Sequence, residues 1–226
     1  MTPKELQKLF DFLNVIPFRE RIDDDAQKKY NLAFKDLQEK VKIQNNRFFI
    51  DHDSFAKVVI QAFENGAKYL KIHLIKETKD LNVNIGFSFS TLKTPKDFTI
   101  DYDLDFFWTL KGDTLVKSLK EPFTVYKTNF QETFSELVRQ STNQKCTEFI
   151  QYDIKDVIRY MLRNFLSNTF ESKKFIFNFF VFKEYGTDPK LNDRIGISVH
   201  NTLTLTDGAN KKEAESIGYD FGTVYP

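Results

Sequence analysis

Two segments of this chain carry small or polar residues at every second position, a spacing that can form a binding surface. They are Gly86, Ser88 and Ser90 in one segment and Gly196, Ser198 and His200 in the other. Alternate side chains of a β-strand share one face, so each set would form a small-residue face. Glycine and serine permit close approach of a ligand, which predicts two shallow ligand-binding pockets near Tyr102 and Tyr219. We favour a helix packed tightly over each face, or a solvated small-residue face, because a pocket also needs convergent polar groups.

An acidic cluster offers a second candidate for chemistry. Asp101, Asp103 and Asp105 resemble a metal site at first sight. On a strand, however, their side chains would lie about 7 Å apart, whereas a calcium loop curls to bring its oxygens onto one ion. We therefore interpret the three residues as the polar edge of a strand.

The histidine and cysteine residues do not indicate a metal site or a catalytic site. His52, His73 and His200 lack metal-ligand spacing. His200 stands where the other segment has Ser90, so an acid–base role would exist on one face alone. Cys146 is the single cysteine, which excludes an intramolecular disulfide, and no base accompanies it in sequence. The sequence has no phosphate-binding loop, dinucleotide fingerprint, nucleophile elbow or zinc signature. We predict no catalytic residue, no metal and no cofactor.

The two small-residue segments belong to a longer repeat. Residues 76–92 and 183–203 share nine identical residues when four residues are inserted in the second copy, whereas ordinary composition gives about one match. The identical pairs are Lys76/Lys183, Glu77/Glu184, Leu81/Leu191, Asn82/Asn192, Ile85/Ile195, Gly86/Gly196, Ser88/Ser198, Thr91/Thr202 and Leu92/Leu203. Upstream, Phe49-Ile50 corresponds to Phe149-Ile150. We interpret this pattern as an internal duplication.

The elements expected around the repeat predict an α+β fold. Each copy reads helix–helix–strand–strand–strand, with antiparallel sheets, helices packed on one face and a pseudo-twofold arrangement of the copies. Residues 1–110 would form the first repeat with an extra helix at 3–13, residues 111–121 a connector, and residues 122–226 the second repeat. Asp53 and Asp153 each precede a helical pattern and are expected to cap it.

Composition restricts the classes of function. The chain has 226 residues, 41% hydrophobic and 29% charged, with a net charge of +1. Such a balance is ordinary for a globular protein and implies no general attraction to nucleic acid or membranes. The sequence has no signal-peptide pattern and no apolar run of membrane-spanning length, so we expect a cytoplasmic protein.

A doubly apolar segment suggests the function. Residues 175–182 read FIFNFFVF, apolar at almost every position. Such a strand is either covered on both faces or forms an association surface, in which case Phe175, Phe177, Phe180 and Phe182 would meet a partner. The leading hypothesis is a non-enzymatic interaction or adaptor protein with an unknown protein partner or a second copy as a homodimer. A small-ligand binder or enzyme that uses the glycine–serine faces is the alternative, and a weak nucleic-acid binder, not expected from the charge, is the third.

Overall fold

A computed structural model of the chain describes the backbone of residues 20–21, 24–79, 82–91, 106–142, 146–166, 171–184, 189–207, 210–215, 219–220 and 223–225. Within these ranges the fold is α+β with two antiparallel sheets, as the sequence predicts. Sheet A has the order β1 (Glu20–Arg21), β11 (Tyr219–Asp220), β9 (Ile195–Asp207), β8 (Glu171–Val181) and β2 (Arg47–Asp51), with β10 (Asn210–Glu215) also on β9. Sheet B has the order β12 (Thr223–Tyr225), β7 (Phe149–Asp153), β3 (Tyr69–Ile75), β4 (Asn84–Ser90), β5 (Phe106–Lys111) and β6 (Thr114–Ser118).

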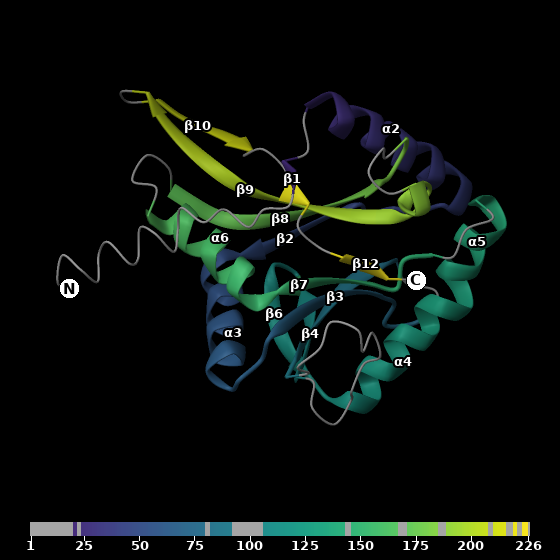
Figure 1. The fold of residues 1–226 in the computed structure, drawn as a ribbon, viewed down its shortest axis with the longest axis horizontal. Helices are drawn as coiled ribbons and strands as arrows, with labels where there is room; N and C mark the ends of the chain where they lie inside the picture. Colours follow the sequence, from purple (N-terminus) through teal and green to yellow (C-terminus); the bar gives the residue numbers. More distant parts are fainter. Residues whose placement is uncertain are drawn as a thin grey trace.

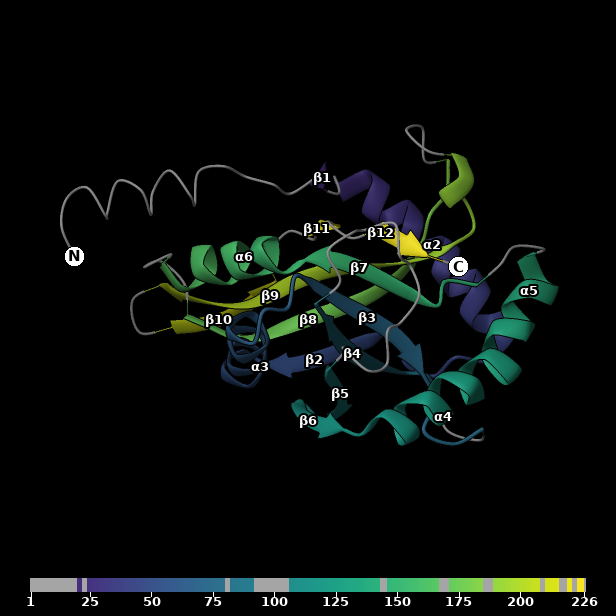
Figure 2. The same cartoon turned by 60° about the horizontal axis from the view of Figure 1, so that its bottom comes forward.

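The two sheets pack face to face, and helices cover their outer faces (Figure 1). Helix α2 (Asp24–Val41) lies on the outer face of sheet A. Helix α4 (Lys120–Phe130) lies on the outer face of sheet B and runs through a π-helical turn, Gln131–Ser135, into α5 (Glu136–Thr142), as Figure 2 shows. Helices α3 (His52–Glu64) and α6 (Ile154–Leu166) pack against each other at one side. None of the described helices is long and apolar enough to span a membrane.

Aromatic side chains fill the space between the sheets. The Phe87 ring of β4 lies 5.8 Å from the Phe177 ring of β8, in an edge-to-face arrangement. Phe55 of α3 contacts both, at 5.9 and 5.7 Å. Edge-to-face pairs at these separations are favourable for aromatic rings. The many phenylalanines of the sequence thus join both sheets and α3 in one core.

The prediction of an exposed phenylalanine surface is wrong. Phe175 and Phe177 face the core between the sheets, and Phe180 and Phe182 face α2, whose Tyr30 stacks on Phe180 at 5.4 Å. All four phenylalanines are at most 2% exposed. Sheet A is covered on both faces, so a strand that is apolar on both faces is buried within the chain itself.

The two halves of the chain, taken as residues up to 119 and from 120 onward, exchange a strand. Strand β2 comes from the first half but pairs with β8 of the second, so that Ile50 lies opposite Phe175. Strand β7 comes from the second half but pairs with β3 of the first, so that Ile150 lies opposite Ile72. Each sheet is therefore complete only when both halves are present.

The two repeated segments, which the sequence places in antiparallel sheets, lie in two hairpins, β3–β4 and β8–β9. The expected connector is different: residues 111–121 contain the last residue of β5, the whole of β6 and the start of α4. Near the end of the second repeat, the described residues form two short strands, β11 and β12, which belong to different sheets. The expected helix at 3–13 and residues 101–105 lie outside the described residues.

Helix α3 begins two residues earlier than the sequence predicts. Asp51 is its N-cap, since the Asp51 carboxylate accepts a hydrogen bond from the Ser54 N–H at 2.9 Å. Asp53 lies in the first turn with its side chain fully exposed, so its assignment as the cap is wrong. At α6 the corresponding prediction holds, because Asp153 accepts from the Lys155 N–H at 2.8 Å. Strand β2 ends at Asp51 and the helix starts at the next residue, so Asp51 occupies the cap position.

Candidate functional site

The small-residue faces of the two hairpins are covered. A side-chain carbon at Gly86 would lie 2.7 Å from the Phe123 ring of α4, and Ser88 and Ser90 are fully buried. A side-chain carbon at Gly196 would meet the rings of Phe180 and Phe182. These glycines therefore make room for aromatic rings of the protein itself, the close approach that glycine in a strand permits.

Both faces contain a buried serine–histidine hydrogen bond. His73 Nε2 lies 2.9 Å from Ser88 Oγ, and His200 Nε2 lies 2.9 Å from Ser198 Oγ. Gln27 of α2 also reaches His200, at 3.1 Å. The sequence analysis assigned Ser198 and His200 to one small-residue face, but it did not assign His73 to the other. The available signal was the hairpin register, which sets His73 opposite Gly86, diagonal to Ser88.

The environment of His73 opposes its protonation. The ring is fully buried and packs edge-on against Phe123 at 5.3 Å. Burial lowers the pKa of His73 well below 6.5, and the positive charges of Lys127 and Lys71 lower it further. Desolvation disfavours the charged imidazolium, so His73 is neutral at physiological pH. Tyr102 and Tyr219 were the other predicted ligand-binding residues. Tyr102 lies outside the described residues, and only the backbone of Tyr219, in β11, is described.

Cys146 is not an activated nucleophile. Its thiol is buried, and burial raises the pKa of Cys146 to about 12. Because the thiolate is the nucleophile, a thiol with this pKa is inert at neutral pH. His52 packs on the Phe175 ring at 4.8 Å, and no group of three metal-binding side chains occurs in the described part of the chain.

An open cleft of about 670 Å³ lies between the edge of sheet A and the turns of sheet B. It follows strand β2, which is the last strand of sheet A among the described residues. Opposite β2 stand the entry to β4 and the β5–β6 turn. The residues that line this cleft, called here the seam cleft, are Asn45, Arg47, Phe48, Phe49, Asn82, Val83, Asn84, Leu110, Gly112, Asp113 and Lys174.

Contacts between the two sides bracket the seam cleft. At one end the Asn82 amide donates to the Gln44 side-chain carbonyl at 2.9 Å. At the other end the Asp51 N–H donates to the Asp113 carbonyl at 2.7 Å. Lys174 of β8 also donates to the Asp113 carboxylate, at 2.8 Å. These bonds hold the two sides at a fixed separation, so the cleft is built into the fold.

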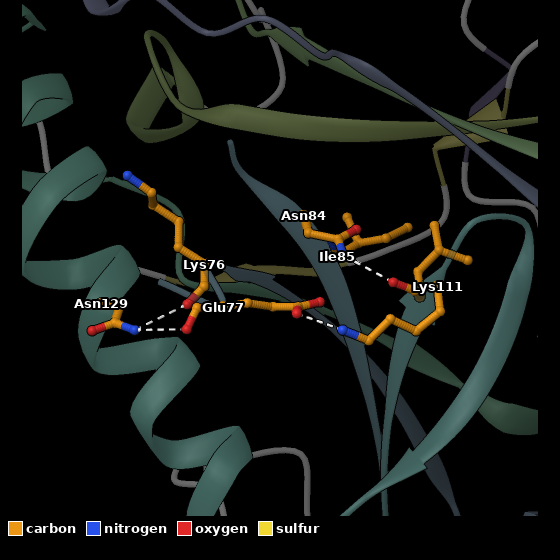
Figure 3. A network of polar contacts seen from close by, with 7 residues as sticks. Lys76, Glu77, Asn84, Ile85, Lys111 and Asn129 are labelled. Atoms are coloured by element: carbon orange, nitrogen blue, oxygen red, sulfur yellow. Dashed lines mark hydrogen bonds and ion pairs between the residues drawn. The ribbon is translucent and has the colours of Figure 1, made fainter. Parts of the chain in front are cut away.

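A polar network supports the side of the cleft that belongs to sheet B (Figure 3). The Asn84 amide donates to the Leu110 carbonyl at 2.9 Å, which joins two lining residues. Next to it, Lys111 forms an ion pair with Glu77. Asn129 of α4 donates to the Glu77 carbonyl at 3.1 Å, so the network is anchored on the helix.

The chemistry of the lining is mixed. Phe48, Val83 and Leu110 are buried apolar residues at the base of the cleft. On the solvent side, the Arg47 guanidinium lies 5.4 Å from the centre of the Phe49 ring, which is 40% exposed. The hydrogen bond and charge of Lys174 lower the pKa of Asp113, so this carboxylate is ionised at neutral pH.

Two smaller cavities are weaker candidates for a binding site. One, of about 340 Å³, lies beside Phe63, Tyr69 and Asp153 where α3 ends and β3 begins. The other, of about 250 Å³, lies beside Leu37, Ser141 and Val181. Each is about half the volume of the seam cleft or less, and neither combines exposed aromatic surface with an arginine. The sequence analysis did not find the seam cleft because its lining comes from four separate segments of the chain, although Asn82 lies in the repeated stretch.

Family models, curated proteins and solved structures were compared with this chain, and no match was found in any of the three comparisons. The function is therefore inferred from the geometry of the site.

Proposed function

We propose that this protein is a non-enzymatic interaction protein that holds part of a partner protein in the seam cleft. The observation that carries this proposal is the lining, which joins a buried apolar base to an arginine stacked on an exposed phenylalanine. Aromatic residues and arginine are enriched in protein–protein interfaces and contribute most of their binding energy. The near-neutral net charge of the chain implies no general attraction to nucleic acid, so we expect the partner to be a protein.

The enzymatic alternative depends on the buried serine–histidine pairs. We assign His73 and Ser88 a structural role, because both are fully buried beneath Phe123. A hydrogen bond between them satisfies two polar groups that would otherwise be costly to bury. A substrate would have to displace part of α4 to reach either atom.

We also propose that residues 1–110 and 122–226 are copies of one ancestral unit, arranged with pseudo-twofold symmetry. The hairpin registers support this proposal: Ile85 pairs with Leu74, and Ile195 pairs with Val181. In both copies the segment that begins at Ile85 or Ile195 forms the second strand of its hairpin. Reciprocal exchange of β2 and β7 resembles a strand-swapped homodimer joined into one chain.

A site-specific cross-link tests the proposed function. A photo-reactive phenylalanine analogue replaces Asn45, an exposed residue of the seam cleft, in the full chain. The matched control carries the analogue at Lys57, an exposed residue of α3 that does not line the cleft. In lysate of the source cells we expect one protein adduct from position 45 that is absent from position 57 and is reduced by Arg47→Glu.

Three results would contradict the proposal. Identical adducts from positions 45 and 57 would mean non-specific contact. An adduct with nucleic acid would favour a nucleic-acid binder. An added antibody against the chain is the positive control for cross-linking in lysate. If the antibody is cross-linked but position 45 gives no adduct, the seam cleft is not a partner site.

A further inference from the structure

The structure contains its own example of strand addition next to the exchanged strand of sheet B. Strand β7 has β3 on one edge and the short strand β12 on the other. Three residues of β12 pair antiparallel with β7, and Tyr225 lies opposite Phe149. Strand β2 is the corresponding exchanged strand of sheet A. It has β8 on one edge and the seam cleft along the other.

The hydrogen-bond alternation of β7 shows which residues face β12. The Leu74 N–H donates to the Glu148 carbonyl, so Glu148 and every second residue after it direct their backbone groups to β3. Phe149 and Gln151 therefore direct theirs to the opposite edge. Their partners there are Tyr225 and Thr223 of β12.

The same alternation holds in β2. The Phe179 N–H donates to the Asn46 carbonyl, so Phe48 and Ile50 direct their backbone groups to β8. Phe49 and Asp51 direct theirs to the open edge, and the Asp51 N–H does meet the Asp113 carbonyl there. Phe49 is thus in the position that Phe149 occupies in β7, with its N–H and carbonyl directed into the seam cleft rather than toward a strand.

The dimensions of the cleft suit a short strand. The contacts at Asn82 and Asp113 bracket the part of β2 from Asn45 to Asp51. Strands rise about 3.4 Å per residue, so a segment of about three residues, the length of β12, fits between the brackets before its ends turn outward. A cleft of about 670 Å³ has room for such a segment with its side chains.

The two sides of an added strand would meet different surroundings. Side chains on the inner side would contact Phe48, Val83 and Leu110, which are apolar. Side chains on the outer side would contact Arg47 and Lys174, which with Asp113 give the charged lining residues an excess of one positive charge. The lining therefore favours a segment in which apolar and acidic residues alternate.

We propose that the seam cleft receives an extended segment of a partner protein, which adds to β2 as an antiparallel strand in the way that β12 adds to β7. The Phe49 N–H and carbonyl provide main-chain hydrogen bonds, and the alternating apolar and acidic side chains provide specificity, as in known strand-addition complexes. This inference rests on the proposed function and specifies the form of the ligand.

The test uses a phage-displayed library of random 12-residue peptides, selected on the immobilised full chain. We expect enriched peptides in which apolar and acidic residues alternate, and expect their affinity to fall at least about tenfold in Arg47→Glu, the scale of a close charge pair turned repulsive. Hydrogen exchange of the Phe49 amide should slow when a synthetic copy of an enriched peptide binds. The Phe48 amide, which bonds to β8, is the internal control and should be protected with and without peptide.

Matched variants separate the backbone from the side chain. Phe49→Pro removes the outward N–H, at an edge position where proline is tolerated. Phe49→Ala removes the ring alone. We expect Phe49→Pro to bind peptide about tenfold more weakly than Phe49→Ala, the scale of one lost hydrogen bond whose partner remains unsatisfied.

The outcomes are distinguishable. Peptides that require Arg47 but neither protect the Phe49 amide nor distinguish the two Phe49 variants would overturn strand addition and leave the proposed function standing. Failure to enrich any peptide that depends on Arg47, together with no cross-link at position 45, would overturn both. A homodimer that Phe49→Pro dissociates and Phe49→Ala does not would also overturn the inference, because a second copy would then be the occupant of the cleft.

Discussion

His73 Nε2 lies 2.9 Å from Ser88 Oγ, in a layer between sheet B and α4 where both side chains are fully buried. A neutral histidine held in this way couples the stability of the fold to pH. Between the lowered pKa of folded His73 and its ordinary value of 6.5, the unfolded chain binds the proton more readily than the folded chain. The free energy of unfolding therefore falls as the pH decreases through this window.

This dependence can be measured by urea unfolding between pH 7.5 and pH 5. We expect His73→Gln, which retains a hydrogen-bonding group near Ser88, to be less stable at pH 7.5 but to lose less stability on acidification below about 6.5 than the unsubstituted protein does. His200→Gln is the control for a second buried histidine on the other sheet. Equal slopes for His73→Gln and the unsubstituted protein would show that His73 does not carry the effect.

The glycines of the two hairpins should be intolerant of a single added carbon. Gly86→Ala would place that carbon 2.7 Å from the Phe123 ring and 3.0 Å from Ile75, and we expect the overpacking to cost about 1–3 kcal/mol. The double variant Gly86→Ala with Phe123→Leu should recover part of this loss in urea unfolding, because the smaller side chain relieves the contact. If Gly86→Ala alone leaves stability unchanged, α4 does not pack on this face as described.

The cap of α3 provides a test of where the helix begins. Asp51→Ala removes the acceptor of the Ser54 N–H, and we expect a loss of about 1 kcal/mol in the free energy of unfolding. Asp53→Ala, two residues further along, removes a fully exposed carboxylate of the first turn and should cost less. Chemical unfolding of the two variants side by side measures the difference, and the reverse order would assign the cap to Asp53.

Exchange of β2 and β7 predicts that neither half folds alone. A fragment of residues 1–119 lacks β7, β8 and β12, and a fragment of residues 120–226 lacks β2 and β3. Each would leave a large apolar sheet face uncovered, so we expect aggregation or non-cooperative unfolding of either fragment alone. The cut follows Leu119, an exposed residue between β6 and α4.

Co-expression of the two fragments, one carrying an affinity tag, provides the positive arm of this test. We expect a one-to-one complex that unfolds cooperatively by circular dichroism. A soluble fragment of residues 1–119 that unfolds cooperatively by itself would contradict the proposed pairing of the halves.

Several features were readable from the sequence because they depend on local patterns. Alternation around Ile85 and Ile195 predicts two strands, and the turns before them predict the hairpins, both of which are present. Helical spacing from Ala26 to Val41 predicts α2. FIFNFFVF predicts a strand that needs cover on both faces, because an apolar surface on each side cannot face water.

What covers each surface was decided by the tertiary structure alone. The sequence favours a packed helix or a solvated face over the small-residue positions, but it does not say that Phe123 would cover Gly86 or that Phe180 and Phe182 would cover Gly196. Pairing of β2 with β8 joins residues more than a hundred positions apart and leaves no periodic signal in either segment. The seam cleft arises where this exchanged strand ends its sheet next to turns of the other one. Strand pairing over such a distance is set by how the apolar faces are buried together in three dimensions, and for this reason the candidate site became visible in the fold alone.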